Sequence, residues 1–300
     1  MSKPSWAEGP PKTILLATDL SSRGDRALDR AAQLSRQWGA RLLVVHVLDP
    51  HESFIERRHL DDLPSWRQPP GRKALAEARL RRDLPEDFGP VAVRVEEGDP
   101  AGVIDDIARA EGCDLIITGV ARDETLGRAF LGATVDRLVR RTPVPILIVK
   151  SRAKPYHEIV VATDFSDSSR HALHAATTFF PHAAITLLHA FEVPFAGFLD
   201  KGDFRDQYRA MEQEACDKFL AGAELSGDQR RALQVLVEYG APELMIRSYM
   251  QDRGANLVAL GTHGRSAVFD VLIGSTAKRI LEFAPADVLL VREPRATVAK

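Results

Sequence analysis

Cysteine is scarce in this chain of 300 residues, which contains only Cys113 and Cys216. Two cysteines cannot build a disulfide framework, and they suit a reducing compartment. An excess of one charge is also lacking, because 40 lysines and arginines stand against 42 aspartates and glutamates, for a net charge of −2. This balance gives no electrostatic reason to bind nucleic acid or an anionic membrane non-specifically, and we expect neither partner.

Long hydrophobic runs are absent as well. The longest, such as PVPILIV at 143–149, fall far short of the ~20 residues that a helix needs to span a bilayer. The N-terminal segment MSKPSWAEGPPK has none of the apolar character of a secretory signal. We therefore expect a soluble, cytoplasmic protein, and the hydrophobic share of 45% is that of an ordinary globular chain.

Comparison of the chain with itself reveals a repeat. ILLATDLS at 14–21 matches IVVATDFS at 159–166, and GDPAGVI at 98–104 matches GAPELMI at 240–246. The matches keep their order along the chain, and the period is far too long for a solenoid. We therefore predict two domains related by internal duplication.

Each half alternates apolar segments with amphipathic ones. TILLAT, RLLVVHVL, VAVRV, DLIITG and PILIVK predict strands in the first half, and EIVVAT, AITLLHA, LQVLVEY, NLVALG and DVLLVR predict strands in the second. This alternation implies parallel pairing through right-handed crossovers, and near-continuous apolar strands indicate helices on both faces. We predict an α/β fold of two tandem, doubly wound, open parallel sheets. The polar link at 151–157 is too short for a flexible tether, so we expect the halves to pack together.

In such sheets a ligand binds beyond the carboxyl ends of the strands, where the strand order reverses. Three segments of the second half converge there: ATDFS at 162–166, GTHGRS at 261–266 and GST at 274–276. Glycine lets the main chain approach a ligand closely, and a helix N-terminus favours phosphate. Asp164 adds a carboxylate that can accept from ribose hydroxyls or hold a metal ion. By themselves these glycines can equally be turn residues, and Ser275 can be a helix cap.

These motifs, in this order and spacing, are similar to those of a known protein family. VATDFS, LLHA, GTHGRS followed by GST, and PADVLLV resemble the ATP-binding signature of the universal stress protein family. Both halves resemble that family, at residues 11–150 and 157–293, and the whole chain looks like a tandem member of it. The resemblance implies strand order 3-2-1-4-5, pairing of the halves through their last strands, ATP with Mg²⁺ as ligand, and a nucleotide-dependent regulatory role in stress tolerance. It also implies a set of nucleotide-binding residues: Thr163, Asp164, Ala190, Gly261, Thr262, His263, Gly264, Arg265, Gly274, Ser275 and Thr276.

The same resemblance implies which part of the nucleotide each of these residues would contact. Thr163 and Asp164 would lie at the adenosine end, and the main chain of Ala190 would contact adenine. Residues 261–265 would surround the ribose and phosphates, and residues 274–276 would hold the phosphates.

The first half departs from this pattern. Gly132 is present, but Arg122 replaces the second glycine of the loop and Ala133 replaces the serine. Asp123 and Glu124 add negative charge that would repel phosphate, although an arginine can also grip one. Our interpretation is that the first half keeps the fold and largely lacks triphosphate binding. Each chain would then hold one nucleotide, in its second half.

Histidines occur in matching places at the ends of the second strands. We interpret His46 and His189 as packed, hydrogen-bonded residues rather than metal ligands. His263 lies inside the glycine-rich loop, where a ligand contact is reasonable. Cys113 and Cys216 lack CxxC partners and are predicted to be buried, small apolar residues.

Several enzyme signatures are missing. The chain has no GxxxxGK[ST] loop, no GxGxxG after its first strand, no GxSxG elbow and no HExxH. No catalytic residue is identified, so we expect at most slow ATP hydrolysis. Two alternatives stay open, a weak ATPase or other nucleotide-dependent enzyme and a nucleotide-free interaction scaffold. Duplication can replace a homodimer, or two chains can pair into a four-domain homodimer.

Overall fold

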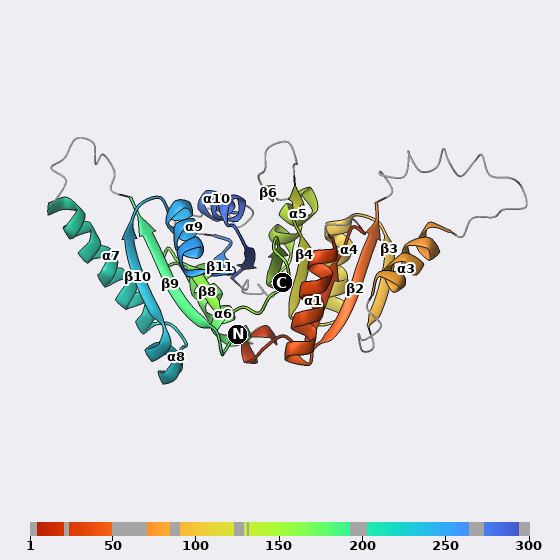
Figure 1. The fold of residues 1–300 in the computed structure, drawn as a ribbon, viewed down its shortest axis with the longest axis horizontal. Helices are drawn as coiled ribbons and strands as arrows, with labels where there is room; N and C mark the ends of the chain where they lie inside the picture. The colour runs from red at the N-terminus through yellow and green to blue at the C-terminus, as the bar shows by residue number, and fades with distance from the viewer. Residues whose placement is uncertain are drawn as a thin grey trace, which may run out of the picture.

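A computed structural model of the protein describes residues 5–20, 24–49, 71–84, 91–122, 129–130, 132–192, 203–263 and 273–293. Within these ranges the chain forms two halves of alternating strands and helices, side by side along the longest axis of the molecule (Figure 1). None of the described helices combines the length and the apolar character that crossing a membrane requires.

The first half begins with a short 3-10 helix, Ser5–Glu8. Five of its strands join the main sheet: β1 (Thr13–Ala17), β2 (Arg41–Leu48), β3 (Ala92–Glu97), β4 (Leu115–Gly119) and β7 (Ile146–Val149). Its helices are α1 (Gly24–Trp38), α3 (Arg72–Asp83), α4 (Pro100–Ala110) and α5 (Ala133–Arg141). Two short strands, β5 (Ala121–Arg122) and β6 (Ala129–Phe130), form a separate antiparallel ladder.

The second half repeats this order. Its strands are β8 (Glu158–Ala162), β9 (Ala184–Phe191), β10 (Gln234–Tyr239), β11 (Leu257–Gly261) and β12 (Asp287–Val291). Its helices are α6 (Asp167–Phe179), α7 (Asp203–Ala221), α8 (Gly227–Ala232), α9 (Pro242–Arg253) and α10 (Ser275–Phe283).

Local sequence explains where several helices begin and end. The Asp99 carboxylate accepts from the Gly102 amide at 3.1 Å and caps α4, and Pro100 occupies the first turn, where no hydrogen bond is lost. The hydroxyl oxygen of Ser166 accepts from the Ser169 amide at 3.2 Å and caps α6. Helix α9 ends at Gly254, whose φ of +70° is the left-handed conformation that glycine adopts most readily.

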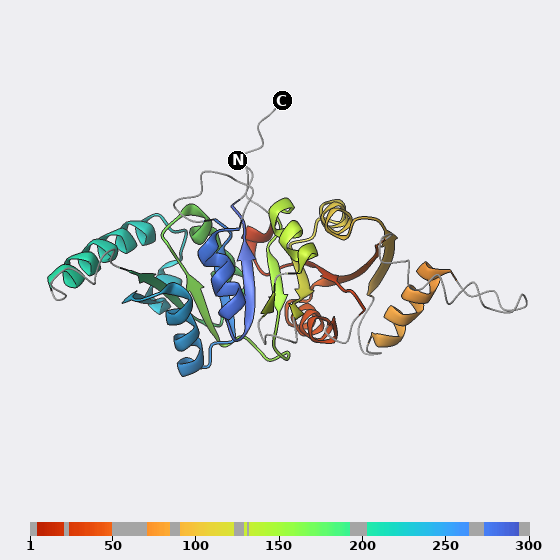
Figure 2. The same ribbon diagram turned by 90° about the horizontal axis from the view of Figure 1, so that it is seen from above.

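All ten main strands belong to one sheet, in the order β10-β9-β8-β11-β12-β7-β4-β1-β2-β3. Within each half the strand order is 3-2-1-4-5, and the pairing is parallel. Strands β7 and β12 meet antiparallel at the centre, with Leu147 opposite Leu289 (Figure 2). The predicted α/β class, strand order and internal duplication are confirmed, and the structure adds that the two sheets are continuous.

Buried apolar side chains form two layers, one on each face of the sheet. Because successive strand residues point to opposite faces, Ile14 and Leu16 enter one layer and Leu15 enters the other. Helices α1, α3, α6 and α7 cover the first layer, and α4, α5, α9 and α10 cover the second. Both layers contain residues of both halves, so the two halves share each layer of the core.

A buried charged cluster joins the two halves beside β12. Arg30 of α1 and Asp287 of β12 are both fully buried and form an ion pair of 3.0 Å. The Asp287 carboxylate also accepts from the Tyr156 hydroxyl at 2.6 Å and from the amides of Lys150 and Ser151, both at 2.9 Å. Burial, followed by the nearby charge of Asp287, raises the pKa of the Tyr156 hydroxyl well above its usual value, so that the hydroxyl stays protonated and donates.

Candidate functional site

The second half contains a cavity of about 380 Å³ beyond the carboxyl ends of β8, β9 and β11. The first turns of α9 and α10 complete its wall. Its apolar lining includes Ala162, Leu188, Ala190, Ile246, Leu260 and Ile280. Its polar lining includes Thr163, Asp164, Ser169, His263, Ser275 and Thr276. We call this space the second cavity.

Thr163 follows β8 and is held by four neighbours. Its amide donates to the Leu188 carbonyl oxygen at 3.0 Å, and its own carbonyl oxygen accepts from Nδ1 of His189 at 2.8 Å. Its hydroxyl oxygen accepts from the Phe165 amide at 2.9 Å and lies 2.9 Å from the Ser169 hydroxyl. Phe165 has a φ of +64°, a conformation that is costly for a bulky residue and persists only where its surroundings enforce it.

Asp164 is oriented by the cap of helix α6. One of its carboxylate oxygens accepts from the Ser166 amide at 3.1 Å and from the Ser166 hydroxyl at 2.6 Å. The same hydroxyl oxygen accepts from the Ser169 amide and so closes the first turn of the helix. A carboxylate that accepts two hydrogen bonds within its own turn stands in a defined position at the edge of the second cavity.

Gly261 ends β11 at a point where α6 passes very close. A Cβ atom placed on Gly261 would lie 2.7 Å from the main-chain carbonyl carbon of Ser168 and 2.5 Å from its Oγ. Our sequence interpretation gave this glycine a role in ligand approach, but the structure gives it a second and sufficient reason. The absence of a side chain at Gly261 is required by helix packing.

Thr262 connects three elements behind the cavity wall. It is 2% exposed, and its amide donates to the Val291 carbonyl oxygen at 3.1 Å. Its carbonyl oxygen accepts from the Gly274 amide at 2.9 Å, and its hydroxyl lies 2.7 Å from Nδ1 of His263. Thr262 therefore positions the start of α10 and the neighbouring histidine.

Helix α10 begins at the second cavity without a side-chain cap. Gly274 is the N-cap residue, no side-chain hydrogen bond closes the first turn, and Ser275 is the first helical residue rather than the cap. The first amides of a helix have no partner inside the helix, and they form the positive end of its dipole. Because Gly274, Ser275 and Thr276 all line the cavity, this positive end faces it.

Eight of the eleven residues predicted to bind nucleotide line this one cavity: Thr163, Asp164, Ala190, Gly261, His263, Gly274, Ser275 and Thr276. Thr262 is buried next to them and is not part of the lining. Gly264 and Arg265 lie outside the described residues.

Sequence reasoning missed other lining residues. Pro242 and Ile246 belong to GAPELMI, which matches GDPAGVI in the first half, so the repeat itself contained a signal for them. Ser169 carried no motif, and its contact with Thr163 emerges only from the fold.

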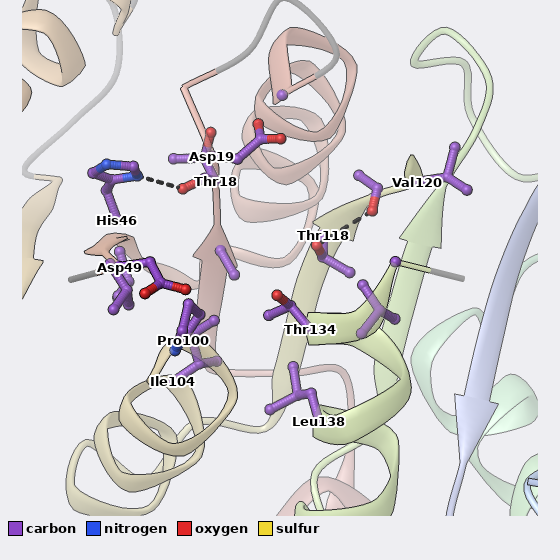
Figure 3. Close-up of a pocket in the computed structure, with 17 residues that line it drawn as sticks. Thr18, Asp19, His46, Asp49, Pro100, Ile104, Thr118, Val120, Thr134 and Leu138 are labelled. Atoms are coloured by element: carbon purple, nitrogen blue, oxygen red, sulfur yellow. Dashed lines mark hydrogen bonds between the residues drawn. The ribbon is translucent and has the colours of Figure 1, made fainter. Parts of the chain in front are cut away.

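The first half contains a matching cavity of about 330 Å³, which we call the first cavity (Figure 3). The Thr18 amide donates to the Val45 carbonyl oxygen at 3.0 Å, and Nδ1 of His46 donates to the Thr18 carbonyl oxygen at 2.9 Å. Leu20, in the place of Phe165, has a φ of +59°. Gly132 is the N-cap of α5 as Gly274 is of α10, again without a side-chain cap.

The lining of the first cavity differs in its polar groups. Figure 3 shows Asp19 and Asp49, which follow strands β1 and β2, and Ile104 and Leu138 on the two helices that line the cavity. Ala133 replaces Ser275 at the first position of the helix. Of the residues predicted to weaken phosphate binding, Arg122 lies on β5, and the acidic pair at 123–124 falls outside the described residues.

The histidines at the ends of the second strands are packed and hydrogen-bonded, as predicted. Each donates from Nδ1 to the carbonyl oxygen of the threonine that follows the first strand. The described part of the chain holds no group of three or more histidine, cysteine, aspartate or glutamate residues that could bind a metal ion.

Together these features define a class of protein, one in which an α/β domain with a cavity at its strand ends is duplicated within a single chain. The sequence profile of the Universal stress protein family matches the chain twice, at residues 11–150 and 155–292. The chain belongs to the universal stress protein family.

Relatives cover either one half or nearly the whole chain. The universal stress protein in the QAH/OAS sulfhydrylase 3′ region of Thermus aquaticus is 32% identical over 139 residues, 46% of this chain and 98% of its own length. A universal stress protein of Mycolicibacterium smegmatis is 24% identical over 290 residues, 93% of this chain and 96% of its own. The crystal structure of a universal stress protein from Archaeoglobus fulgidus DSM 4304 has a TM-score of 0.62 at 19% identity, with coverage of 94% and 98%, which supports the fold alone.

Proposed function

We propose that this protein is a cytoplasmic, nucleotide-dependent regulatory protein of stress tolerance that binds ATP in its second cavity. The observation that carries the proposal is the uncapped N-terminus of α10 at that cavity. There, Ser275 and Thr276 can offer main-chain amides and hydroxyl groups to the same ligand. Such helix ends bind phosphate because their unpaired amides and dipole both favour an anion.

The opposite end of the second cavity suits a nucleoside. Leu188, Ala190 and Ile246 provide an apolar surface for a flat base. Asp164 stands at the strand end with its carboxylate oriented by Ser166, and a carboxylate accepts hydrogen bonds from ribose hydroxyls. The volume of about 380 Å³ lies within the range of small-molecule sites.

Magnesium would enter this site together with the nucleotide. Asp164 is the only carboxylate among the described lining residues, and no three-residue metal cluster occurs in the described ranges. The polyphosphate would therefore supply most oxygen ligands, and Asp164 is the protein group that could add one. When bound, the ion would neutralise phosphate charge.

We propose one nucleotide per chain, with residues 157–293 as the binding domain and residues 11–150 as a domain that keeps the fold and the cavity. Ala133 offers no hydroxyl where Ser275 does. Among the described lining residues, the first cavity has two carboxylates, Asp19 and Asp49, and the second cavity has one, Asp164. Both differences disfavour a polyphosphate in the first half.

Isothermal titration with ATP and Mg²⁺ tests the proposal, and we expect a stoichiometry of one. The informative variant is Ser275→Glu, because a carboxylate in the first turn of a helix favours the dipole and repels phosphate. The free variant should keep its melting temperature, whereas ATP binding should be lost. Ala133→Glu places the same charge on α5 in the first half and should leave ATP binding unchanged.

The outcomes separate the alternatives. At a nucleotide concentration of 100 times Kd, the wild type should gain about 2.7 kcal/mol of stability. A stoichiometry of two would contradict the assignment to one cavity. A melting temperature that ATP, ADP and AMP all leave unchanged would indicate a nucleotide-free scaffold. Phosphate release well above that of an Asp164→Ala control would indicate an enzyme.

A further inference from the structure

His189 lies where β9 meets the second cavity and contacts two oxygen atoms through its two ring nitrogens. Nδ1 is 2.8 Å from the carbonyl oxygen of Thr163. Nε2 is 3.1 Å from a carboxylate oxygen of Glu212 on α7. The side chain of His189 is only 9% exposed and that of Glu212 only 23%, so solvent screens this pair much less than a surface pair.

Both neighbours are hydrogen-bond acceptors. A carbonyl oxygen cannot donate, and an ionised carboxylate cannot donate either. Nδ1 needs its proton to donate to the carbonyl oxygen, so a neutral imidazole leaves Nε2 without a proton beside the carboxylate, whereas an imidazolium places a proton and a positive charge there. We propose that Glu212 is a positioning residue, which holds His189 as an imidazolium so that its Nδ1–H fixes the main chain of Thr163 at the edge of the nucleotide cavity. This inference rests on the proposed function.

An aromatic contact supports the same protonation state. The Phe165 ring lies over His189, with ring centroids 4.2 Å apart and an interplanar angle of 34°. The face of an aromatic ring attracts a cation. Phe165 also contacts Phe219 of α7, with ring centroids 5.7 Å apart, so α7 supports both the histidine and the residue with the strained φ.

The other charged groups that flank His189 have contacts of their own. On the neighbouring strand β10, His189 pairs with the uncharged Val237. Glu238 of that strand lies 3.7 Å from Arg209 of α7 in an ion pair of its own. Asp164, which follows β8, accepts from Ser166. Glu212 is thus the acid that the geometry assigns to His189.

The first half offers a natural comparison for this pair. Lys73 of α3 forms an ion pair of 3.2 Å with Glu96 of β3, in the place where Arg209 of α7 pairs with Glu238 of β10. Three residues further along each helix stand Ala76 in the first half and Glu212 in the second. His46 keeps the contact with its threonine carbonyl, and the described residues give it no acidic partner. The acid is therefore a feature of the half proposed to bind ATP.

Histidine titration by NMR in the absence of nucleotide tests the pair directly. His189 should lose its proton at a lower pH in Glu212→Gln than in the wild type, because glutamine keeps the shape and removes the charge. Glu214→Gln removes the same charge from the same helix, but Glu214 is 68% exposed and pairs with Lys218, so this control should leave the titration unchanged. An unchanged His189 titration in Glu212→Gln would overturn the proposal, whether or not ATP binds.

The pH dependence of ATP affinity tests the consequence. The Thr163 carbonyl would lose its charge-assisted donor when His189 is deprotonated, so affinity should fall as the pH rises through that step. A loss of about tenfold is expected, the size of one hydrogen bond to a charged group. Glu212→Gln should move this step to lower pH, and Glu214→Gln should not. ATP binding with the same pH profile in all three proteins would overturn the inference and leave the proposed function intact, whereas no binding at any pH would contradict the proposed function itself.

Discussion

The two cavities share their main-chain frame and differ in the side chains that face a ligand. Both halves hold the threonine after the first strand by the same two contacts, from a histidine ring and to a strand carbonyl. Both place a non-glycine residue at positive φ two positions later, and both begin the last helix at a glycine cap. The volumes are similar, at about 330 and 380 Å³.

The differences lie in the side chains that surround this shared frame. Ala133 stands in place of Ser275, Leu20 in place of Phe165, and Ala76 in place of Glu212. A fold held by main-chain hydrogen bonds keeps its cavity when such residues change. The presence of a cavity therefore does not identify its ligand, because the side chains that line the cavity determine what it binds.

The largest expected effect comes from a residue that only one half has. Asp287 pairs with buried Arg30, whereas Pro145 occupies the matching position before β7. Asp287→Ala should lower the free energy of unfolding by about 3–5 kcal/mol, because it leaves a buried guanidinium without its acid. Urea denaturation measures this loss.

Two further variants sharpen that result. Pro145→Ala should change the stability by much less, since no charged partner depends on it. The double variant Arg30→Met with Asp287→Ala should be less destabilised than the sum of the single changes. If Asp287→Ala unfolds at the same urea concentration as the wild type, the buried ion pair does not hold the halves together.

A smaller effect is expected at the end of β11. Gly261→Ala places a Cβ atom 2.7 Å from the main chain of Ser168 and should cost about 1–3 kcal/mol even without nucleotide. Gly227→Ala is the control, because its Cβ would meet only the end of the Arg231 side chain at 3.5 Å. Thermal denaturation of the free proteins distinguishes the two. If Gly261→Ala has the same stability as the wild type, helix packing does not require this glycine, and ligand approach would be its role.

The smallest difference concerns the two thiols, one in each half. Burial raises the pKa of both Cys113 and Cys216 to about 11. An unfolded thiol loses its proton near pH 8.5, so these groups favour the folded state less as the pH rises from about 9 to 11. At pH 8 both should react slowly with iodoacetamide, and at similar rates. Rapid labelling of one alone would show that its half opens more readily.

Sequence reasoning predicted the fold well because the repeat and the apolar strands are local signals. The duplication was predicted from the repeat, whereas the strand order and the eight cavity-lining residues were implied by the resemblance to the universal stress protein family. Parallel strands bring their carboxyl ends to one edge, so residues that follow them must meet.

Other features could not be predicted, because they depend on contacts between distant segments. The close approach of Ser168 to Gly261 requires the packing of α6 on β11. The Arg30–Asp287 ion pair joins residues from opposite halves, and neither position carries a motif. The acid that faces His189 comes from a helix whose register on the sheet the sequence does not define.

The central pairing of β7 with β12 has an evolutionary consequence. When two identical polypeptides meet through such a seam, every mutation appears on both sides of it. Here both copies lie in one polypeptide. Residues around one cavity can therefore change while the other half keeps the residues that stabilise the fold. An internal duplication therefore lets the two halves diverge in sequence, which identical subunits of a symmetric assembly cannot do.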